Sequence, residues 1–223
     1  MNAVRRALAA VAVSGTALAG VGVAGVTAAQ AANHVPTALS ITAPARITYG
    51  NAATVTGKLT TTGSHKALPG LTVALEERST GTTTWTSAGT QTTAADGSVS
   101  FSVKPPRTEE FQLVHAATSG TKASTSATAT IKVAYAVTAS LTGNKVSVTV
   151  APIAATQKVL LQRKGSSAKQ WSTLATRKLN KTSSATFTIK APTAAGTYHY
   201  RVVKLAAHGF LAGVSATMTL TVP

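Results

Sequence analysis

The stretch that decides the fold occurs twice in this chain of 223 residues. The first copy reads LTVAL at residues 71–75, Trp85, VSFSV at residues 99–103 and Pro106. The second copy reads KVLL at residues 158–161, Trp171, ATFTI at residues 185–189 and Pro192. Matched positions are 86 residues apart, and a later pair, SATATIKV at residues 126–133 and SATMTLTV at residues 215–222, is 89 apart. This spacing predicts two copies of one module with a small insertion between the matched blocks.

Apolar and polar residues alternate through nearly the whole chain after residue 38. Clear cases are Val99-Ser-Phe101-Ser-Val103 in the first copy and Val146-Ser-Val148-Thr-Val150 in the second. This alternation is typical of strands with one buried and one wet face. Asp96-Gly97 supplies the positive φ angles of a tight turn before one of these strands. With the Trp-bearing segments included, each copy shows seven segments, which predicts an all-β fold of two seven-stranded antiparallel sandwiches.

The two modules are expected at residues 32–134 and 135–223. Val133 closes the last alternating segment of the first copy and Tyr135 opens the second, with no Gly-, Pro- or Ser-rich linker between them. Modules joined this tightly cannot tumble freely, so we expect a restricted hinge.

Several segments of the first copy resemble the bacterial immunoglobulin-like repeats of secreted and cell-wall proteins, especially those of high-GC Gram-positive bacteria. They are ITYGNAATVTGKL at residues 47–59, LPGLTVALEER at residues 68–78 and ADGSVSFSV at residues 95–103. The second copy looks like a diverged member, because it keeps VLLQR and YHYRV at residues 159–163 and 198–202 but lacks the Asp-Gly turn. The resemblance implies tandem immunoglobulin-like sandwiches used as spacers, adhesion modules or accessory domains, and it specifies no site.

Residues 1–31 have the pattern of a secretory signal peptide. Arg5 and Arg6 precede a run rich in Ala, Val and Gly, and Ala29-Gln-Ala31 has the small-x-small form of a cleavage site. The alternative is an uncleaved membrane anchor, since the run is long enough to cross a bilayer. Without a second apolar span we expect the mature chain to be secreted and extracellular. The chain has no Cys, hence no disulfide and no Cys-linked lipid.

Charge is distributed unevenly between the modules. Residues 32–134 hold eight basic residues and all five acids, a net charge of +3. Residues 135–223 hold 11 basic residues and no acid, a net charge of +11. A field of one sign over a small module attracts polyanions, although surface charge also serves solubility alone.

The residues give no support to catalysis or to a bound cofactor. Glu76-Glu77 and Glu109-Glu110 are sequence neighbours on expected strands, so the two carboxylates of each pair point to opposite faces. Asp96 is the only Asp and is explained by its turn, and the five His show no metal-ligand spacing. We therefore predict no enzyme activity, no catalytic residue, no metal and no cofactor.

Two positions allow two interpretations each. Trp85 and Trp171 follow polar hairpins and either pack over the sheet or serve as stacking platforms for a sugar or a base.

In the second module, Lys158, His199 and Arg201 fall on the outward parity of two strands that neighbour each other in an immunoglobulin-like sandwich. We expect them on one exposed face, with Lys164 and Lys169 at one end of it. Arg177, Lys178 and Lys181 are expected in the following loop, at the opposite end.

Three hypotheses follow for function. The first is a secreted, non-catalytic tandem that associates with the cell envelope, or another anionic surface, through the basic second module. Its candidate residues are Lys158, Lys164, Lys169, Arg177, Lys178, Lys181 and Arg201. The second is a structural or protein-interaction module that pairs through an exposed sheet edge and binds no polyanion. The third is extracellular nucleic-acid binding, which shares the charge but lacks aromatics interleaved with outward basic residues.

Overall fold

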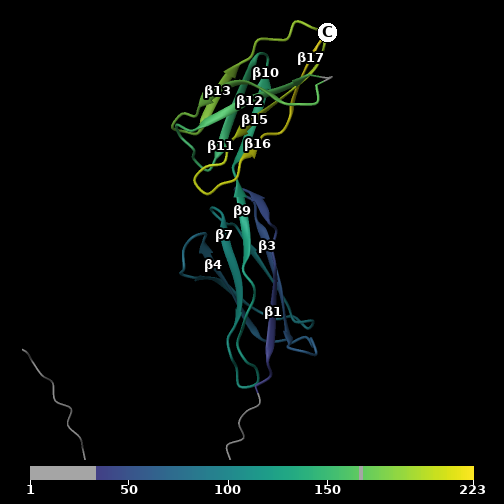
Figure 1. Cartoon of the computed structure of the whole chain (residues 1–223), viewed down its shortest axis with the longest axis vertical. Helices are drawn as coiled ribbons and strands as arrows, with labels where there is room; N and C mark the ends of the chain where they lie inside the picture. Colours follow the sequence, from purple (N-terminus) through teal and green to yellow (C-terminus); the bar gives the residue numbers. More distant parts are fainter. Residues whose placement is uncertain (1–33, 166–167) are drawn as a thin grey trace, which may run out of the picture. The chain divides into compact units, whose positions relative to one another are not determined.

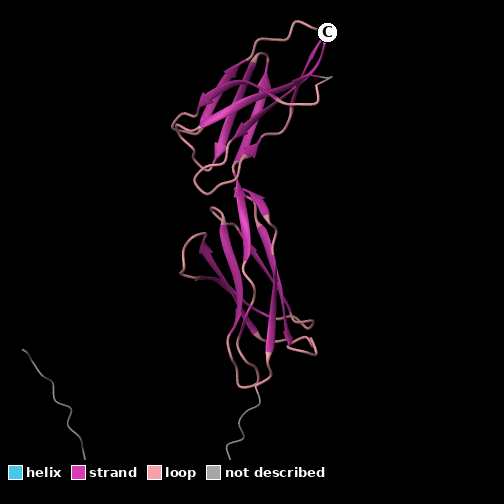
Figure 2. Ribbon diagram, in the orientation of Figure 1, coloured by secondary structure: helices cyan, strands magenta, loops and turns pink. Residues whose placement is uncertain are grey.

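The computed structural model describes residues 34–165 and 168–223, and every regular element in this part of the chain is a β-strand (Figure 2). The expected all-β class is thus confirmed. The predicted signal peptide, residues 1–31, lies outside the described residues. Within the described part, no helix is available to cross a membrane.

The first module is a sandwich of two sheets (Figure 1). One sheet has the strand order β1-β3-β6 and the other has β2-β9-β7-β4-β5, with β8 added beside β7. The strands are β1 Thr37–Thr42, β2 Arg46–Thr48, β3 Ala53–Thr61, β4 Thr72–Ser79, β5 Thr86–Thr92, β6 Ser98–Val103, β7 Glu109–His115, β8 Ser124–Thr125 and β9 Ala129–Ala134.

The second module repeats this arrangement. One sheet has the order β10-β11-β14, and the other has β13-β12-β15, with β16 and β17 both pairing β15. The strands are β10 Ala136–Thr142, β11 Lys145–Ala151, β12 Lys158–Gly165, β13 Ser172–Lys178, β14 Ser184–Thr188, β15 Gly196–Lys204, β16 Gly213–Val214 and β17 Met218–Val222. The chain therefore folds as two tandem immunoglobulin-like sandwiches.

The structure has more strand segments than the seven expected per module, because the last strand of each module is interrupted. The hydroxyl of Ser126 accepts a hydrogen bond from the Leu113 amide at 2.9 Å, which breaks the ladder between β8 and β9. Ser215 does the same for the Val202 amide between β16 and β17. With each broken strand counted once, and the short β2 counted with β1, both modules have the seven strands that the alternation predicts.

Each module buries its own apolar core between its two sheets. In the first, Val55, Leu75, Phe111 and Leu113 are fully buried, and in the second Val146, Val159, Phe187 and Tyr200 are. These residues occupy the inward positions of alternating segments, so the period-two pattern translates directly into one dry face per sheet.

The first module passes into the second through a single connecting residue, Tyr135. Strand β9 ends at Ala134 and β10 begins at Ala136. The Tyr135 amide donates to the Leu211 carbonyl, and the Leu211 amide donates to the Val133 carbonyl, so the connecting residue is held by backbone hydrogen bonds on the described chain. The module limits 32–134 and 135–223 stay a prediction.

A matched turn precedes β6 and β14. In the first module, the Ala94 amide donates to the Ser98 carbonyl and Gly97 has a φ of +80°. In the second, the Asn180 amide donates to the Ser184 carbonyl, and Ser183 takes the glycine position with a φ of +57°. A Cβ built on Gly97 would lie 2.5 Å from the Leu59 carbonyl oxygen. The turn of the first module therefore requires glycine for its φ and for its close approach to β3.

We expect Gly97→Ala to lower the free energy of unfolding by roughly 2 kcal/mol or more, since alanine would both strain φ and push against backbone. Gly63→Ala is the matched control, because Gly63 has a similar φ of +87° but open space around it. The control should cost only about 1 kcal/mol. Urea unfolding of both variants checks this, and equal losses would show that the approach to Leu59 is unimportant.

Candidate polyanion-binding face

The outward face of the sheet β13-β12-β15 carries the candidate residues. On β12, Val159 and Leu161 are buried, so Lys158, Leu160, Gln162 and Lys164 alternate to the other face. Strand β15 lies beside β12 with Gln162 opposite Arg201 and Lys164 opposite His199. This confirms that the two strands are neighbours and that Lys158, His199 and Arg201 share one face.

Three residues, the tryptophan cluster, gather at one end of this face: Lys164, Trp171 and Arg201. The Arg201 guanidinium carbon lies 4.3 Å from the centroid of the Trp171 ring, and the Lys164 ammonium lies 5.7 Å from it. The Arg201 Nε donates to Gln162 Oε1 at 2.8 Å. Stacking and this hydrogen bond hold the guanidinium in place while its two terminal nitrogens keep the forked geometry that suits phosphate or carboxylate.

Two further candidates, the lysine cluster, meet at the other end of the face. Lys158 and Lys178 are directly opposite each other on β12 and β13, and both are exposed. Like charges in this position destabilise a sheet unless something offsets them. Four of the seven candidates thus share the outward face, as two pairs.

The other three candidates lie off this face. Arg177 is opposite the buried Val159, so it has the inward parity and is exposed at the sheet edge. Lys181 is exposed in the turn between β13 and β14, and Lys169 is exposed in the connection between β12 and β13. The expectation that Arg177 and Lys178 belong to a loop is wrong, because β13 continues to Lys178 through its pairing with β12.

The equivalent face of the first module has the same scaffold but balances its charges. Arg78 stacks on Trp85 at 4.3 Å and forms an ion pair with Glu110 at 2.6 Å. Gln112 donates to Glu76 Oε2 at 2.7 Å. Strand register equates Arg78 with Lys164, and it equates Glu110 with His199. The ion pair between Arg78 and Glu110 therefore has no counterpart in the second module, where Lys164 is opposite His199.

At each position where the first module has an acid, the equivalent position of the second module has a neutral or basic residue. Glu76 and Glu77 correspond to Gln162 and Arg163, Asp96 to Thr182, and Glu109 and Glu110 to Tyr198 and His199. Where Glu77 and Glu109 lie near each other in the first module, the Arg163 guanidinium carbon lies 5.5 Å from the Tyr198 ring in the second.

The turns before β6 and β14 show that the second module keeps the same local structure without a carboxylate. Asp96 Oδ1 accepts hydrogen bonds from the amide and hydroxyl of Ser98, which lower the pKa of this carboxyl. In the second module Asn180 Oδ1 accepts from the amide and hydroxyl of Thr182 and from the Ser184 amide. A neutral amide does the work of a carboxylate, so the turn survives and the charge is removed.

The support given to Arg201 was missed by sequence reasoning. Gln162 was not among the candidates and Trp171 was considered only as a packing residue or a stacking platform for a ligand, yet they hold the guanidinium between a hydrogen bond and a ring. The signal was present in the repeat: Glu76 aligns with Gln162 and Gln112 aligns with Arg201, and in both modules the donor lies on the second strand of the pair and the acceptor on the first. Trp85 and Trp171 are both half-buried, each with an arginine at its ring.

Two buried titratable groups end the equivalent strands β7 and β15. His115 is 1% exposed, with its ring nitrogens 2.9 Å from the Thr72 carbonyl and from the Thr121 hydroxyl. Lys204 donates to the Leu205 carbonyl at 2.7 Å and lies over the Tyr135 ring, and burial lowers its pKa. Both groups form their hydrogen bonds within their own module.

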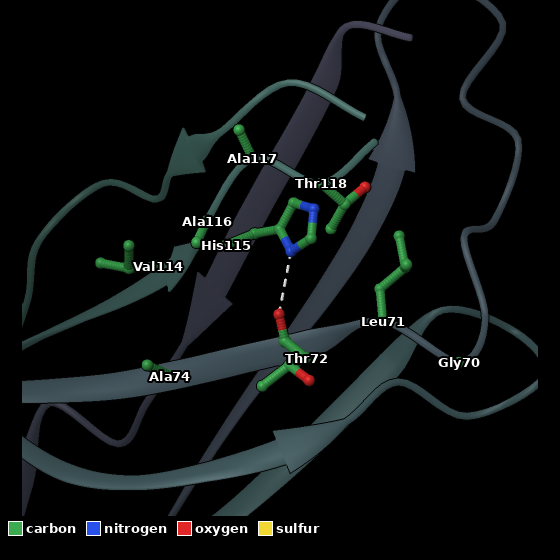
Figure 3. A pocket seen from close by; sticks show the side chains of 9 residues that line it. All are labelled: Gly70, Leu71, Thr72, Ala74, Val114, His115, Ala116, Ala117 and Thr118. Atoms are coloured by element: carbon green, nitrogen blue, oxygen red, sulfur yellow. Dashed lines mark hydrogen bonds between the residues drawn. The ribbon is translucent and has the colours of Figure 1, made fainter. Parts of the chain in front are cut away.

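A pocket of about 320 Å³ opens beside His115 in the first module (Figure 3). Its walls are mostly small apolar side chains, among them Leu71, Ala74 and Val114. Figure 3 shows one imidazole nitrogen joined to the Thr72 carbonyl. The other nitrogen bonds the Thr121 hydroxyl, so neither is left to orient a ligand. In the part of the chain that the structure describes, no three His, Cys, Asp or Glu side chains come together to bind a metal.

No family model matches this chain, and no curated protein matches it. Among solved structures it is similar to E. coli alpha-2-macroglobulin, with 12% identity and a TM-score of 0.38 over 84% of this chain and 17% of that one. A tetra-tandem repeat from the extending region of a large adhesion protein matches with 17% identity and a TM-score of 0.35, over 82% and 50%. The chicken interferon gamma receptor alpha chain matches with 13% identity and a TM-score of 0.45, over 85% and 99%. These likenesses concern β-sandwich architecture and say nothing about ligands.

Glu109 provides a pH test of the first module. It is 7% exposed, and its Oε2 has no hydrogen-bond partner among the described residues. Burial raises the pKa of this carboxyl and the nearby Glu77 raises it further, against a smaller opposing effect of Arg107. A raised pKa in the folded state means that the stability this group contributes at acid pH is lost as pH rises through that pKa.

We therefore expect Glu109→Gln to raise the free energy of unfolding by about 1 kcal/mol at pH 7, because it removes a poorly paired buried charge. The gain should shrink as pH falls and the wild-type carboxyl becomes protonated. Urea unfolding at pH 7 and pH 4 checks this. Glu110→Gln is the control, since it breaks the ion pair with Arg78 and should destabilise at pH 7. A loss of stability in Glu109→Gln at pH 7 would contradict the assignment.

Proposed function

We propose that this protein is a secreted, non-catalytic pair of immunoglobulin-like modules that associates with an anionic polymer of the cell envelope, or another anionic surface, through the outward face of its second module. The observation that carries the proposal is the comparison between modules. One scaffold occurs twice, and all five carboxylates of the first copy are replaced in the second.

The energetics of the face support a polyanionic partner. Two cations converge on Trp171 and two lysines oppose each other on neighbouring strands, and residues 135–223 contain no acid to pair with them. Bringing like charges together costs free energy that a bound anion would recover. Surface charge needed only for solubility does not require a stacked and hydrogen-bonded arginine.

A protein-interaction role through a sheet edge is the alternative, and one observation favours it. Strand β5 is an outer strand of its sheet, is almost wholly exposed and contains no charged residue or Pro. Edge strands normally carry such residues to prevent pairing with another chain. Binding through β5 would survive high salt and would be indifferent to the basic residues of the second module.

Extracellular nucleic-acid binding is a third candidate with the same electrostatics. Stacking of bases needs open aromatic faces, and Arg201 already lies over the Trp171 ring. Competition separates the two polyanions: a phosphate-rich wall polymer should displace DNA from the protein more readily than DNA displaces the polymer.

The first test is retention of the intact tandem on phosphocellulose across a salt gradient. We expect retention well beyond that of a control protein with the same net charge, and steep release as salt screens the face over about 10 Å. Retention no greater than that of the control would leave the charge as a solubility feature and would favour the edge-pairing role.

The second test returns carboxylates to the second module. Gln162→Glu with His199→Glu restores the acids found at the equivalent positions 76 and 110, and it should lower affinity for the anionic matrix at least about tenfold. The control, Thr149→Glu with Thr186→Glu, makes the same charge change at exposed positions on the other sheet. If both double variants lose affinity equally, only net charge matters and the face is not the site.

A further inference from the structure

The two cationic clusters on the outward face are separated by the length of one strand. Lys158 and Lys164 are six residues apart on β12 and have the same parity. A strand rises about 3.3 Å per residue, so Lys158 and Lys164, the far ends of the two clusters, are roughly 20 Å apart, and Arg201, opposite Gln162, lies roughly 13 Å along the strands from Lys158. At physiological salt, charges are screened over about 8 Å. A small anion bound at one cluster therefore does not interact electrostatically with the other.

The row between the clusters is uncharged and mostly apolar. Leu160 on β12 is opposite Val203 on β15, and Val203 is opposite Val214 on β16. Val203 is 8% exposed and Val214 is 48% exposed, and on the other side of Leu160 the exposed Thr176 of β13 completes the row, so the row offers surface but no charged side chain. An anionic group placed over it would lose water without finding a cation to pair with. The face is thus divided into two cationic ends and an uncharged centre.

We infer that the clusters are two half-sites for one linear polyanion, and that the face selects its ligand by length. This inference rests on the proposed function and specifies its ligand: a flexible chain with repeated anionic groups, such as a phosphate polymer, long enough to span about 20 Å. Binding at the tryptophan cluster places the rest of the chain near the lysine cluster. The second contact then forms at high effective concentration, while a shorter chain gains only one half-site.

The test measures binding of the intact tandem to inorganic polyphosphates of graded chain length by isothermal titration calorimetry at one fixed salt concentration. Affinity should be weak and nearly constant for chains shorter than the gap. It should rise at least about tenfold once the extended chain exceeds roughly 20 Å. Arg201→Gln should weaken binding of short and long chains alike, because the tryptophan cluster contributes to both.

The deciding variant is Lys158→Gln with Lys178→Gln, which removes the lysine cluster. It should leave short-chain affinity nearly unchanged and abolish the rise for long chains. The matched control is Lys145→Gln with Lys190→Gln, two exposed lysines of the same module away from this face, and it should keep the rise.

Two other results would overturn the inference in distinguishable ways. If affinity grows smoothly with length and both double variants lower it equally at every length, the face is a diffuse positive surface. The proposed association with polyanions then stands without a length requirement. If no polyphosphate binds beyond the retention expected from net charge, the proposed function fails together with the half-sites.

Discussion

The pairing of β12 with β15, and of β4 with β7 in the first module, is the constraint on which the rest of the structure depends. On its inward side this ladder sets Leu161 opposite Val202, and Leu75 opposite Leu113, in the centre of each core. On its outward side the same register sets Gln162 opposite Arg201 and Glu76 opposite Gln112. Core and surface are therefore fixed by one set of backbone hydrogen bonds, and a one-residue slip would exchange them.

This coupling explains how one scaffold can carry two different surfaces. The inward residues must fill a dry space and change little between the modules, whereas the outward residues meet water and can change charge without disturbing the sheet. Arginine on tryptophan persists in both modules, but it comes from β4 in the first and from β15 in the second. The carboxylates disappear, and Asn180 preserves the turn that Asp96 supports in the first module.

Much of the fold could be read from the sequence because alternation reports burial directly. The strands holding Phe101 and Phe187, the Asp96-Gly97 turn and the seven-strand count all agree with the structure, whereas the equivalent turn before Phe187, built on Asn180 and Ser183, was not predicted. The breaks at Ser126 and Ser215 could not be predicted, because a hydroxyl interrupts the ladder only when a particular amide from β7 or β15 lies opposite it. The loop expected at Arg177 and Lys178 was wrong for a related reason: strand length depends on the partner strand.

The candidate face, too, was predictable from the sequence in part. The sequence by itself determined that residues 135–223 carry 11 cations and no acid, and that Lys158 and Arg201 have the outward parity, because charge and period are local properties. Only the tertiary structure decided which cations meet. It brought Lys164 and Arg201 to Trp171 and Lys158 to Lys178, and it left Arg177, Lys169 and Lys181 off the face. Which residues are opposite one another depends on strand register, and register is set by the packing of the whole core rather than by any one segment.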